Sequence, residues 1–321
     1  MKNKQLFLGV GSALAMLVLI LDGKTALLGA RQGVQLCLQT VVPSLFPFFL
    51  LTNLLTSSLA GVPSQALGPL GKLYGVPEGT EPLLLAGLLG GYPAGAQSIA
   101  QSYRAGQISR QEGERLLAFC NQPGPAFLFG MVGFLFPRRW MVWLLWGIVL
   151  LSALVTARFL GNRPGRAITL PAKKPASPLV AALRATGTVC GWVVIFRVIL
   201  AFLSRWVLWL VPVEGQALLT GLLELTNGCL LLGGVPDMRL RFVLAAGLLT
   251  FGGLCVGLQT LSLLEGLSPR CYLLGKLLQT AIALSLALAV TFGIWLPVAV
   301  LFLLFALVRQ KRGSISKEAG V

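Results

Sequence analysis

Long apolar runs separated by short polar segments dominate this sequence. Such runs stand at about 6–21, 41–59, 140–157, 187–211 and 242–264. Of the 321 residues, 56% are hydrophobic and 11% are charged, whereas a soluble domain carries about 25% charged residues. Backbone polar groups in lipid must be bonded within the protein, so such runs fold as helices. We therefore expect an all-α, polytopic helical membrane protein with about eight transmembrane helices, within a range of roughly seven to ten.

The apolar stretch at 87–130 is interrupted twice, which a plain transmembrane helix does not tolerate. The first interruption is Gly-Gly-Tyr-Pro at 90–93, and the second is Asn-Gln-Pro-Gly-Pro at 121–125. Between them, Ser109 and Glu112 fit the capping box S-x-x-E, which predicts a short helix at about 109–120. Broken backbone persists at membrane depth only where protein buries it or where it lines a water-filled cavity. We therefore predict a functional site in this stretch.

Other segments predict less regular structure. The half-polar residues 24–40 indicate an interfacial amphipathic helix that precedes the second span. Residues 61–81 are rich in Gly and Pro, which indicates a loop or a re-entrant hairpin. The apolar run at 126–136 has about 11 residues, which suits a half-helix or a re-entrant limb better than a span. If it spans fully, the number of helices changes.

Basic residues predict the topology. The segment 161–178 contains four Lys and Arg residues and no acid, which is typical of a cytoplasmic loop. The net charge of +16 is explained by this topology and by anionic lipid headgroups, and not by nucleic acid. We expect both termini to be cytoplasmic. The chain then divides into a first membrane half at 1–160, the basic loop at 161–178, a second membrane half at 179–312 and a polar tail at 313–321.

The second half of the chain repeats elements of the first. GLLGGYPAGAQSI at 87–99 matches GLLTFGGLCVGLQTL at 247–261 after a small insertion. The match continues as Gly-x-(x)-Ser at 106–109 and 266–268, each followed by a predicted helix. Paired, glycine-interrupted hydrophobic segments in corresponding halves indicate a transporter binding site near the membrane midplane. The sequence leaves open whether the halves are parallel or inverted.

Glu224 is the strongest single candidate residue. It stands inside the apolar run 216–234 and is followed by Leu, Thr226, Asn227 and Gly. A carboxylate within a membrane segment is costly and usually functional. Its role would be to accept hydrogen bonds from a solute or to coordinate a coupling cation. The alternative is a structural ion pair with Arg197, and both roles can hold together.

The remaining candidates lie at the helix interruptions. Backbone groups freed at a break, and a helix restarting after the second one, can bind an anionic or carbonyl oxygen, although a plain surface loop is the alternative. Tyr92 could stack on a ring-shaped solute or simply lie at the interface. The candidate substrate-binding residues are Gly91, Tyr92, Pro93, Gln97, Asn121, Gly124, Glu224, Thr226, Asn227, Gly253 and Gln259.

The chain offers little for catalysis. It contains no histidine, which excludes histidine triads and zinc sites that need His. Its six cysteines form no C-x-x-C pair and stand mostly in apolar context, as small buried residues do. There is no nucleophile motif and no cluster of carboxylates. We expect no enzyme activity, no metal and no cofactor.

Several motifs together resemble the sporulation integral membrane protein YlbJ family. They are G-Y-P-x-G-A at 91–96, F-C-N-x-x-G-P at 119–125, P-S-L-F-P-F at 43–48 and E-L-T-N-G at 224–228, and the resemblance covers about 40–280. Such proteins are grouped with the nucleoside-recognition, or Gate, domains, which are related to pore-forming parts of concentrative nucleoside transporters and ferrous-iron permeases. The resemblance implies a multi-pass protein of the bacterial inner membrane that is linked to spore formation and cortex assembly. It implies no particular substrate.

Two functions remain in competition at this point. The first is a Gate-type transporter or channel for a small polar solute, whose broken segments would meet around a polar cavity holding Glu224 and Asn121. The second is a non-transporting membrane scaffold for sporulation-stage assembly, with a dry core in which Arg197 and Glu224 neutralise each other. The expected partners are the solute, membrane lipids, and either further copies of the chain or sporulation membrane proteins.

Overall fold

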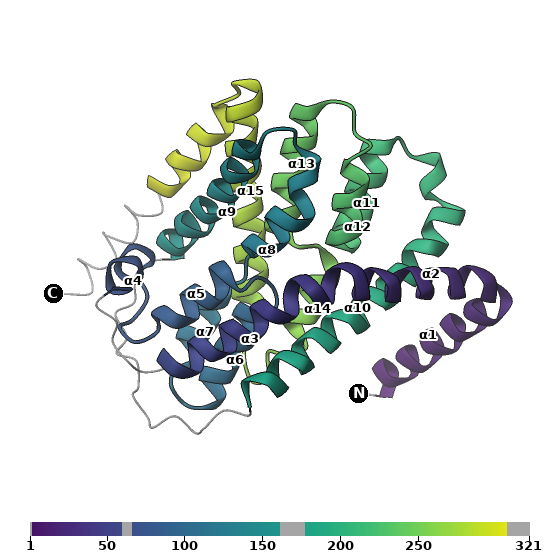
Figure 1. The fold of residues 1–321 in the computed structure, drawn as a ribbon, viewed down its shortest axis with the longest axis horizontal. Coiled ribbons are helices and arrows are strands. Elements are labelled where there is room, and N and C mark those ends of the chain that lie inside the picture. Colours follow the sequence, from purple (N-terminus) through teal and green to yellow (C-terminus); the bar gives the residue numbers. More distant parts are fainter. Residues whose placement is uncertain (1, 60–65, 161–176, 307–321) are drawn as a thin grey trace.

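Every regular element in the computed structural model is helical, within the residues that it describes, 2–59, 66–160 and 177–306 (Figure 1). Turns of π and 3-10 type interrupt several helices. The helices are α1 (Lys2–Leu21), α2 (Gly23–Leu36), α3 (Val42–Leu59), α4 (Gly68–Tyr74), α5 (Glu81–Leu89), α6 (Ala94–Arg104), α7 (Arg110–Leu117), α8 (Pro125–Phe127), α9 (Arg139–Leu160), α10 (Pro178–Trp206), α11 (Val213–Leu223), α12 (Leu225–Leu232), α13 (Met238–Phe251), α14 (Gly253–Leu261) and α15 (Arg270–Phe292).

Membrane-length helices confirm the predicted class. Five helical segments are long and apolar enough to cross a membrane: Gly23–Leu55, Arg139–Leu160, Pro178–Trp206, Met238–Leu261 and Arg270–Phe292. Three shorter apolar helices are Gly9–Leu21, Pro125–Leu135 and Leu296–Ala306. The predicted number of about eight is reached only when these shorter helices are included. The chain is therefore a polytopic helical membrane protein.

The amphipathic helix and the second span were predicted as separate elements, and this boundary is wrong. α2 continues through a π turn, Cys37–Val41, directly into α3. In that turn the N–H of Val42 bonds to the carbonyl of Cys37, five residues earlier. The widened turn stands immediately before Pro43, which has no N–H to donate. The helix consequently passes the proline without ending.

Other local predictions agree with the structure. Ser109 caps α7 by accepting a hydrogen bond from the N–H of Glu112, as the capping box predicts. The run at 126–136 forms a short limb, Pro125–Leu135, of α, π and 3-10 turns. The segment 61–81 contains one short helix, α4, in its described part. Most of the basic loop and the whole polar tail lie outside the described residues.

The two predicted membrane halves pack against each other rather than standing apart. α10 lies along α2 and α3, and α15 lies against α7 and α9 (Figure 1). One buried apolar cluster joins α9, α12, α13 and α15, and a second joins α5, α6, α7 and α9. A third joins α3 to α10. The helix breaks described next lie where these clusters meet.

Candidate functional site

The two breaks of the first half are packed directly against each other. α5 ends before Gly90, and α6 begins at Ala94. The second break, 118–124, separates α7 from α8, and its Gln122 N–H donates to the carbonyl of Gly87 on α5. A Cβ on Gly87 or on Gly95 would overlap the carbonyl oxygen of Cys120. Glycine is therefore required at both positions to bring the two breaks together.

The second half contains a comparable pair of breaks. Residue 224 interrupts what was predicted as one apolar run, so that α11 ends at Leu223 and α12 begins at Leu225. Gly252 and Gly253 separate α13 from α14, and both have positive φ, at 86° and 76°. A Cβ on Gly253 would lie 2.8 Å from the carbonyl oxygen of Gly221, so this break packs on the end of α11.

Left-handed glycines occur at matching places of the predicted repeat. Gly91, with a φ of 81° in the first half, corresponds to the Gly252 and Gly253 pair of the second half. Gly106 (72°) corresponds to Gly266 (80°). A helix, α7 or α15, begins a few residues after each member of the latter pair. This local agreement favours the repeat, which stays a prediction, as does the relation between the halves.

Hydrogen bonds between buried side chains join the breaks of the two halves. The hydroxyl of Tyr92 donates to the carbonyl of Leu249, near the end of α13. The side-chain amide of Asn121 donates to the hydroxyl of Thr260 at 2.9 Å. On α15, the side-chain amide of Gln279 accepts from the amide of Gln122 and donates to the carbonyl of Ala118, both in the second break. These bonds join three of the breaks into one polar core, and the fourth, at Glu224, is joined by the packing of Gly253 on Gly221.

A small, partly open cavity of about 50 Å³ lies at this meeting point. The breaks at 90–93, 118–124 and 224 contribute to its wall. The π turn Cys37–Val41 with the start of α3, and the helices α10 and α14, form the rest. Its polar side chains come from Thr40, Ser44, Tyr92, Glu224, Thr226 and Gln259, and Gly91 and Gly124 add backbone. Val41, Leu45, Phe127, Val189, Val193, Leu225 and Val256 complete it.

Glu224 serves as the N-cap of α12 as well as part of the cavity wall. Its Oε1 accepts from the N–H of Thr226 at 3.0 Å, and its Oε2 accepts from the N–H of Asn227 at 2.8 Å. The side-chain amide of Asn227 also donates to Oε2, at 2.6 Å. A carboxylate has about four lone-pair directions, so one remains for a donor inside the cavity. The residue is only 2% exposed.

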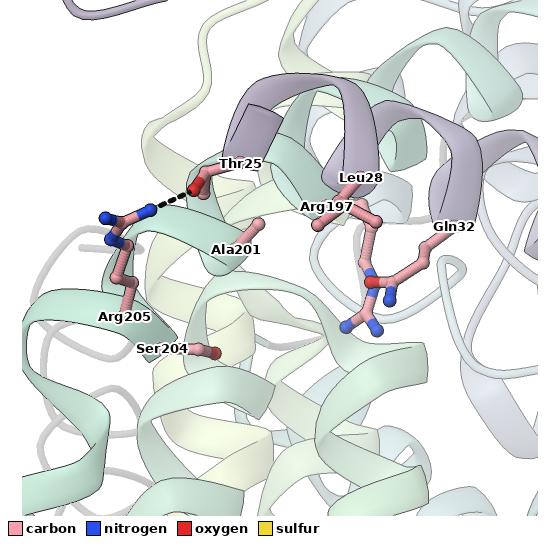
Figure 2. Close-up of a pocket in the computed structure, with 7 residues that line it drawn as sticks. All are labelled: Thr25, Leu28, Gln32, Arg197, Ala201, Ser204 and Arg205. Carbon is pink, nitrogen blue, oxygen red and sulfur yellow. Dashed lines mark hydrogen bonds between the residues drawn. The ribbon is translucent and has the colours of Figure 1, made fainter. Parts of the chain in front are cut away.

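Arg197 does not pair directly with this carboxylate, although the two charges interact. No ion pair joins Arg197 to Glu224 in the part of the chain that the structure describes. The guanidinium of Arg197 instead lines a separate pocket between α2 and α10 (Figure 2). The structural role of Glu224 is therefore the cap of α12, and the ion pair considered as an alternative does not form among the described residues.

The structure brings six of the eleven candidate residues to the cavity. They are Gly91, Tyr92, Gly124, Glu224, Thr226 and Gln259. Asn227 lies beside them and bonds to Glu224. Asn121 is fully buried in the same polar core but outside the cavity wall. Pro93, Gln97 and Gly253 also lie outside the wall, although Gly253 supports the break at Glu224.

Lys276 is a core residue that sequence reasoning did not identify. Its ammonium donates to the carbonyl of Asn121 and lies 5.2 Å from the centroid of the Tyr92 ring. It is 3% exposed and forms no ion pair with a carboxylate among the described residues. Like Glu224, a charged lysine inside an apolar helix is a functional-site candidate. Lys276 was overlooked because it lies near the polar start of α15.

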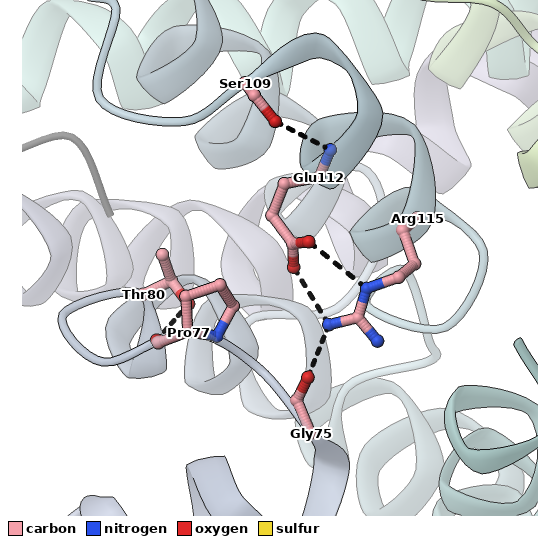
Figure 3. A network of polar contacts seen from close by, with 6 residues as sticks. All are labelled: Gly75, Pro77, Thr80, Ser109, Glu112 and Arg115. Atoms are coloured by element: carbon pink, nitrogen blue, oxygen red, sulfur yellow. Dashed lines mark hydrogen bonds and ion pairs between the residues drawn. The ribbon is translucent and has the colours of Figure 1, made fainter. Parts of the chain in front are cut away.

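The charged residues of α7 also lie deeper than predicted. We expected Arg110, Glu112, Glu114 and Arg115 at the interface or in a polar cavity. Glu112 and Arg115 are instead buried as an ion pair, with Nη2 of Arg115 at 2.9 Å from Oε1 of Glu112 (Figure 3). The same Nη2 donates to the carbonyl of Gly75 at 2.6 Å, which ties α7 to the end of α4. This pair is structural and lies outside the cavity.

Comparisons with known proteins find one partial relative. A stretch of 135 residues is 35% identical to the sporulation integral membrane protein YlbJ of Bacillus subtilis (strain 168). The match covers 41% of this chain and 31% of the Bacillus protein, so less than a third of that protein is represented. No family model matches the chain, and no solved structure matches it. The similarity supports the resemblance seen in the motifs.

Proposed function

We propose that this protein moves a small polar solute or an ion through its broken-helix core, with Glu224 as the charged group of the passage. The observation that carries the proposal is the convergence of three helix breaks on one partly enclosed cavity whose wall includes this carboxylate. Broken backbone at membrane depth is stable where it lines such a cavity. Discontinuous helices that meet at a polar site are also the usual construction of transporter binding sites.

The size of the cavity limits what it holds in this conformation. A water molecule needs about 10–15 Å³ of such volume, so about 50 Å³ holds a few waters or one bare cation. A nucleoside would enter only after the surrounding helices separate. The proposal therefore names a small cation, or a small solute with N–H or O–H donors, as the cargo.

The charges of the core favour the same class. Glu224 offers one unused acceptor direction to the cavity, and the side chains of Gln259 and Thr226 lie in the same wall. Lys276 contacts Tyr92, which also lines the cavity, so the core contains one acidic and one basic group. A cation bound by Glu224 would be attracted by the carboxylate and repelled by the lysine. Such opposed forces suit a site that must also release its cargo.

The setting of this activity forms part of the proposal. The name of the Bacillus relative supports a role in sporulation, and the cortex assembly implied by the motif resemblance belongs to the same stage. The protein would lie in the inner membrane of a spore-forming bacterium, with both termini in the cytoplasm. It would act as a transporter, without enzyme activity or a cofactor.

A non-transporting scaffold is the second candidate. The hydrogen bonds of Gln122, Gln279, Asn121 and Thr260 favour it, because they fasten the two halves together across a small cavity. The neutral pair of Arg197 and Glu224 that this function predicted does not form among the described residues. In this role the polar core would position surfaces for partner proteins.

Uptake by reconstituted vesicles separates the two functions. The panel contains monovalent and divalent cations, amino acids and nucleosides. The variants are Glu224→Gln and its control Glu214→Gln, which lies on the preceding helix α11 and outside the cavity. We expect uptake of at least one member by the native protein, loss of at least tenfold in Glu224→Gln, and native rates in the control. Folded native protein that takes up no member of the panel would establish the scaffold instead.

A second pair of variants leaves the cap of α12 intact. Val193→Phe fills the cavity from α10, whereas Ile195→Phe adds the same bulk two residues away, where the side chain is exposed. If the cavity is the passage, only the first variant blocks uptake. Overpacking costs about 1–3 kcal/mol, so thermal unfolding of both variants is measured alongside. Equal uptake by these two folded variants would contradict the proposed passage.

A further inference from the structure

A second pocket lies between α2 and α10, away from the helix breaks (Figure 2). Its volume is about 270 Å³, close to the roughly 300 Å³ of the smaller ligand sites in proteins. The helices approach closely here, because a Cβ on Gly29 of α2 would lie 2.8 Å from the Cα of Val198 on α10. The lining residues are Thr25, Leu28, Gln32, Arg197, Ala201, Ser204 and Arg205.

All polar side chains in this wall can donate hydrogen bonds, and none is acidic. Nη1 of Arg205 donates to the hydroxyl of Thr25 at 2.9 Å, and that hydroxyl also hydrogen-bonds to the carboxylate of Asp22. Nη1 of Arg205 also pairs with Oδ2 of Asp22 at 2.9 Å, just outside the pocket. Arg197 forms no ion pair in the described part of the chain. Two guanidinium groups against one carboxylate leave the pocket with an excess positive charge.

The position of the pocket along α10 fits the headgroup level of a bilayer. Arg205 stands next to the exposed Trp206 at the end of the helix, and Trp and Arg at helix ends are typical of the membrane interface. Arg197 is eight residues earlier, about 12 Å deeper at 1.5 Å per residue. An arginine at that depth requires an anionic or carbonyl partner, because an uncompensated charge in the membrane is costly.

We propose that this pocket binds a phosphoryl group, supplied by an anionic phospholipid or by inorganic phosphate. A phosphoryl group offers several oxygen acceptors to donors that surround it, and guanidinium groups bind it in a bidentate manner. The donors in the wall are Arg197 and Gln32 on one side, and Ser204 and Arg205 on the other (Figure 2). Leu28 in the same wall is 58% exposed, so apolar surface continues from the pocket to the outside of the protein and can receive an acyl chain. The lining of this pocket shares no residue with the cavity proposed for transport.

Ligand retention by the purified full-length protein tests this site. The probes are phosphatidylglycerol, diacylglycerol without the phosphoryl group, and inorganic phosphate, each measured by native mass spectrometry and by the shift in thermal unfolding temperature. The variants are Arg197→Gln, Arg197→Lys and the matched control Arg184→Gln, an exposed arginine on α10 outside the pocket. Arg197→Lys keeps the charge without the planar fork and also guards against a folding defect in the first variant.

We expect native protein and the Arg184→Gln control to retain phosphatidylglycerol at least about tenfold better than diacylglycerol. Arg197→Gln should lower that retention about tenfold, and Arg197→Lys should lie between them. Phosphate binding that depends on Arg197, without a corresponding effect on the lipid, would assign the pocket to free phosphate. If none of the three variants changes the retention of phosphatidylglycerol or of phosphate, the proposed site is wrong.

Discussion

Lys276 donates a hydrogen bond from its buried ammonium group to the backbone carbonyl of Asn121. The carbonyl belongs to the break between α7 and α8, and the lysine belongs to α15, so the contact joins two regions more than 150 residues apart in sequence. Its other described neighbour of note is the ring of Tyr92, at 5.2 Å. A charge held by one carbonyl and one aromatic ring contributes little net stability, because desolvation of an ammonium costs several kcal/mol.

Replacing Lys276 with methionine should therefore change the stability little. Lys276→Met keeps most of the volume, and relief from desolvation offsets the lost hydrogen bond, so we expect the free energy of unfolding to stay within about 1 kcal/mol of the native value. Lys276→Ala should cost about 2–5 kcal/mol, because it also leaves a void. Thermal and denaturant unfolding in detergent measure both. A methionine variant as unstable as the alanine variant would contradict this weak balance.

Glu224 should contribute to stability through its cap as well as to uptake. Glu224→Gln keeps one acceptor oxygen and exchanges the other for an amide donor, so only one of the N–H groups of Thr226 and Asn227 keeps its acceptor. We expect the free energy of unfolding to fall by about 1–3 kcal/mol, as for a buried donor that loses its acceptor. The matched variant Glu214→Gln should change it by less than about 0.5 kcal/mol. Equal unfolding temperatures for the two variants would exclude the cap.

Local sequence patterns were sufficient for the breaks and for Glu224. Three glycine and proline residues within four or five positions end a helix regardless of the rest of the fold, so the interruptions at 90–93 and 121–125 are visible in the sequence. A single carboxylate in an apolar run is equally conspicuous. The cap that Glu224 forms was not predicted, because the apolar pattern around it indicates one uninterrupted helix.

Features that depend on distant contacts were missed. Whether Arg115 faces water or pairs with Glu112 in the interior depends on α4, which supplies the carbonyl of Gly75 from 40 positions away. The same holds for Lys276, since its burial depends on where Asn121 is placed. Periodicity and composition describe the residue and its neighbours along the chain, and they carry no information on such partners.

The buried pair of Arg115 and Glu112 should be costly to break. Arg115→Met removes the partner of a carboxylate that is itself buried, and leaves the carbonyl of Gly75 without this donor. Such half-broken buried pairs cost about 3–5 kcal/mol. The control Arg110→Met breaks a pair whose arginine is 61% exposed and therefore screened by water, so its loss should change the stability little. Similar unfolding temperatures for the two methionine variants would contradict the buried pair.

Acid should weaken the contact of α7 with the start of α15. Partial burial raises the pKa of Glu114, but hydrogen bonds from Arg110 and from the N–H of Ser268, with the charge of Arg110, outweigh it and lower the pKa below its usual value. A carboxyl group with a lowered folded-state pKa stabilises the fold above its unfolded pKa of about 4.3, and this contribution is lost as pH falls through the folded value.

The measurement for Glu114 is unfolding temperature against pH for native protein and Glu114→Gln. We expect the native protein to be more stable by a constant margin from about pH 6 to pH 8, and the margin to shrink as the pH falls below about 4.3. Glu265→Gln is the control, since this exposed carboxylate is held by Arg104 alone among the described residues. A margin that stays constant down to pH 3 would show that the carboxylate does not contribute through its charge.

The close packing of the first two breaks predicts a strong difference between two glycines. Gly95→Ala places a Cβ on the carbonyl of Cys120, where the obstacle is backbone and cannot rotate away, so we expect a loss of more than about 3 kcal/mol or no folded protein. Gly147→Ala lies on the exposed side of α9 with no neighbour in reach, and should be neutral or stabilising by up to about 1 kcal/mol. Yield of monodisperse protein and thermal unfolding compare the two, and a tolerated alanine at position 95 would show that the two breaks do not pack as described.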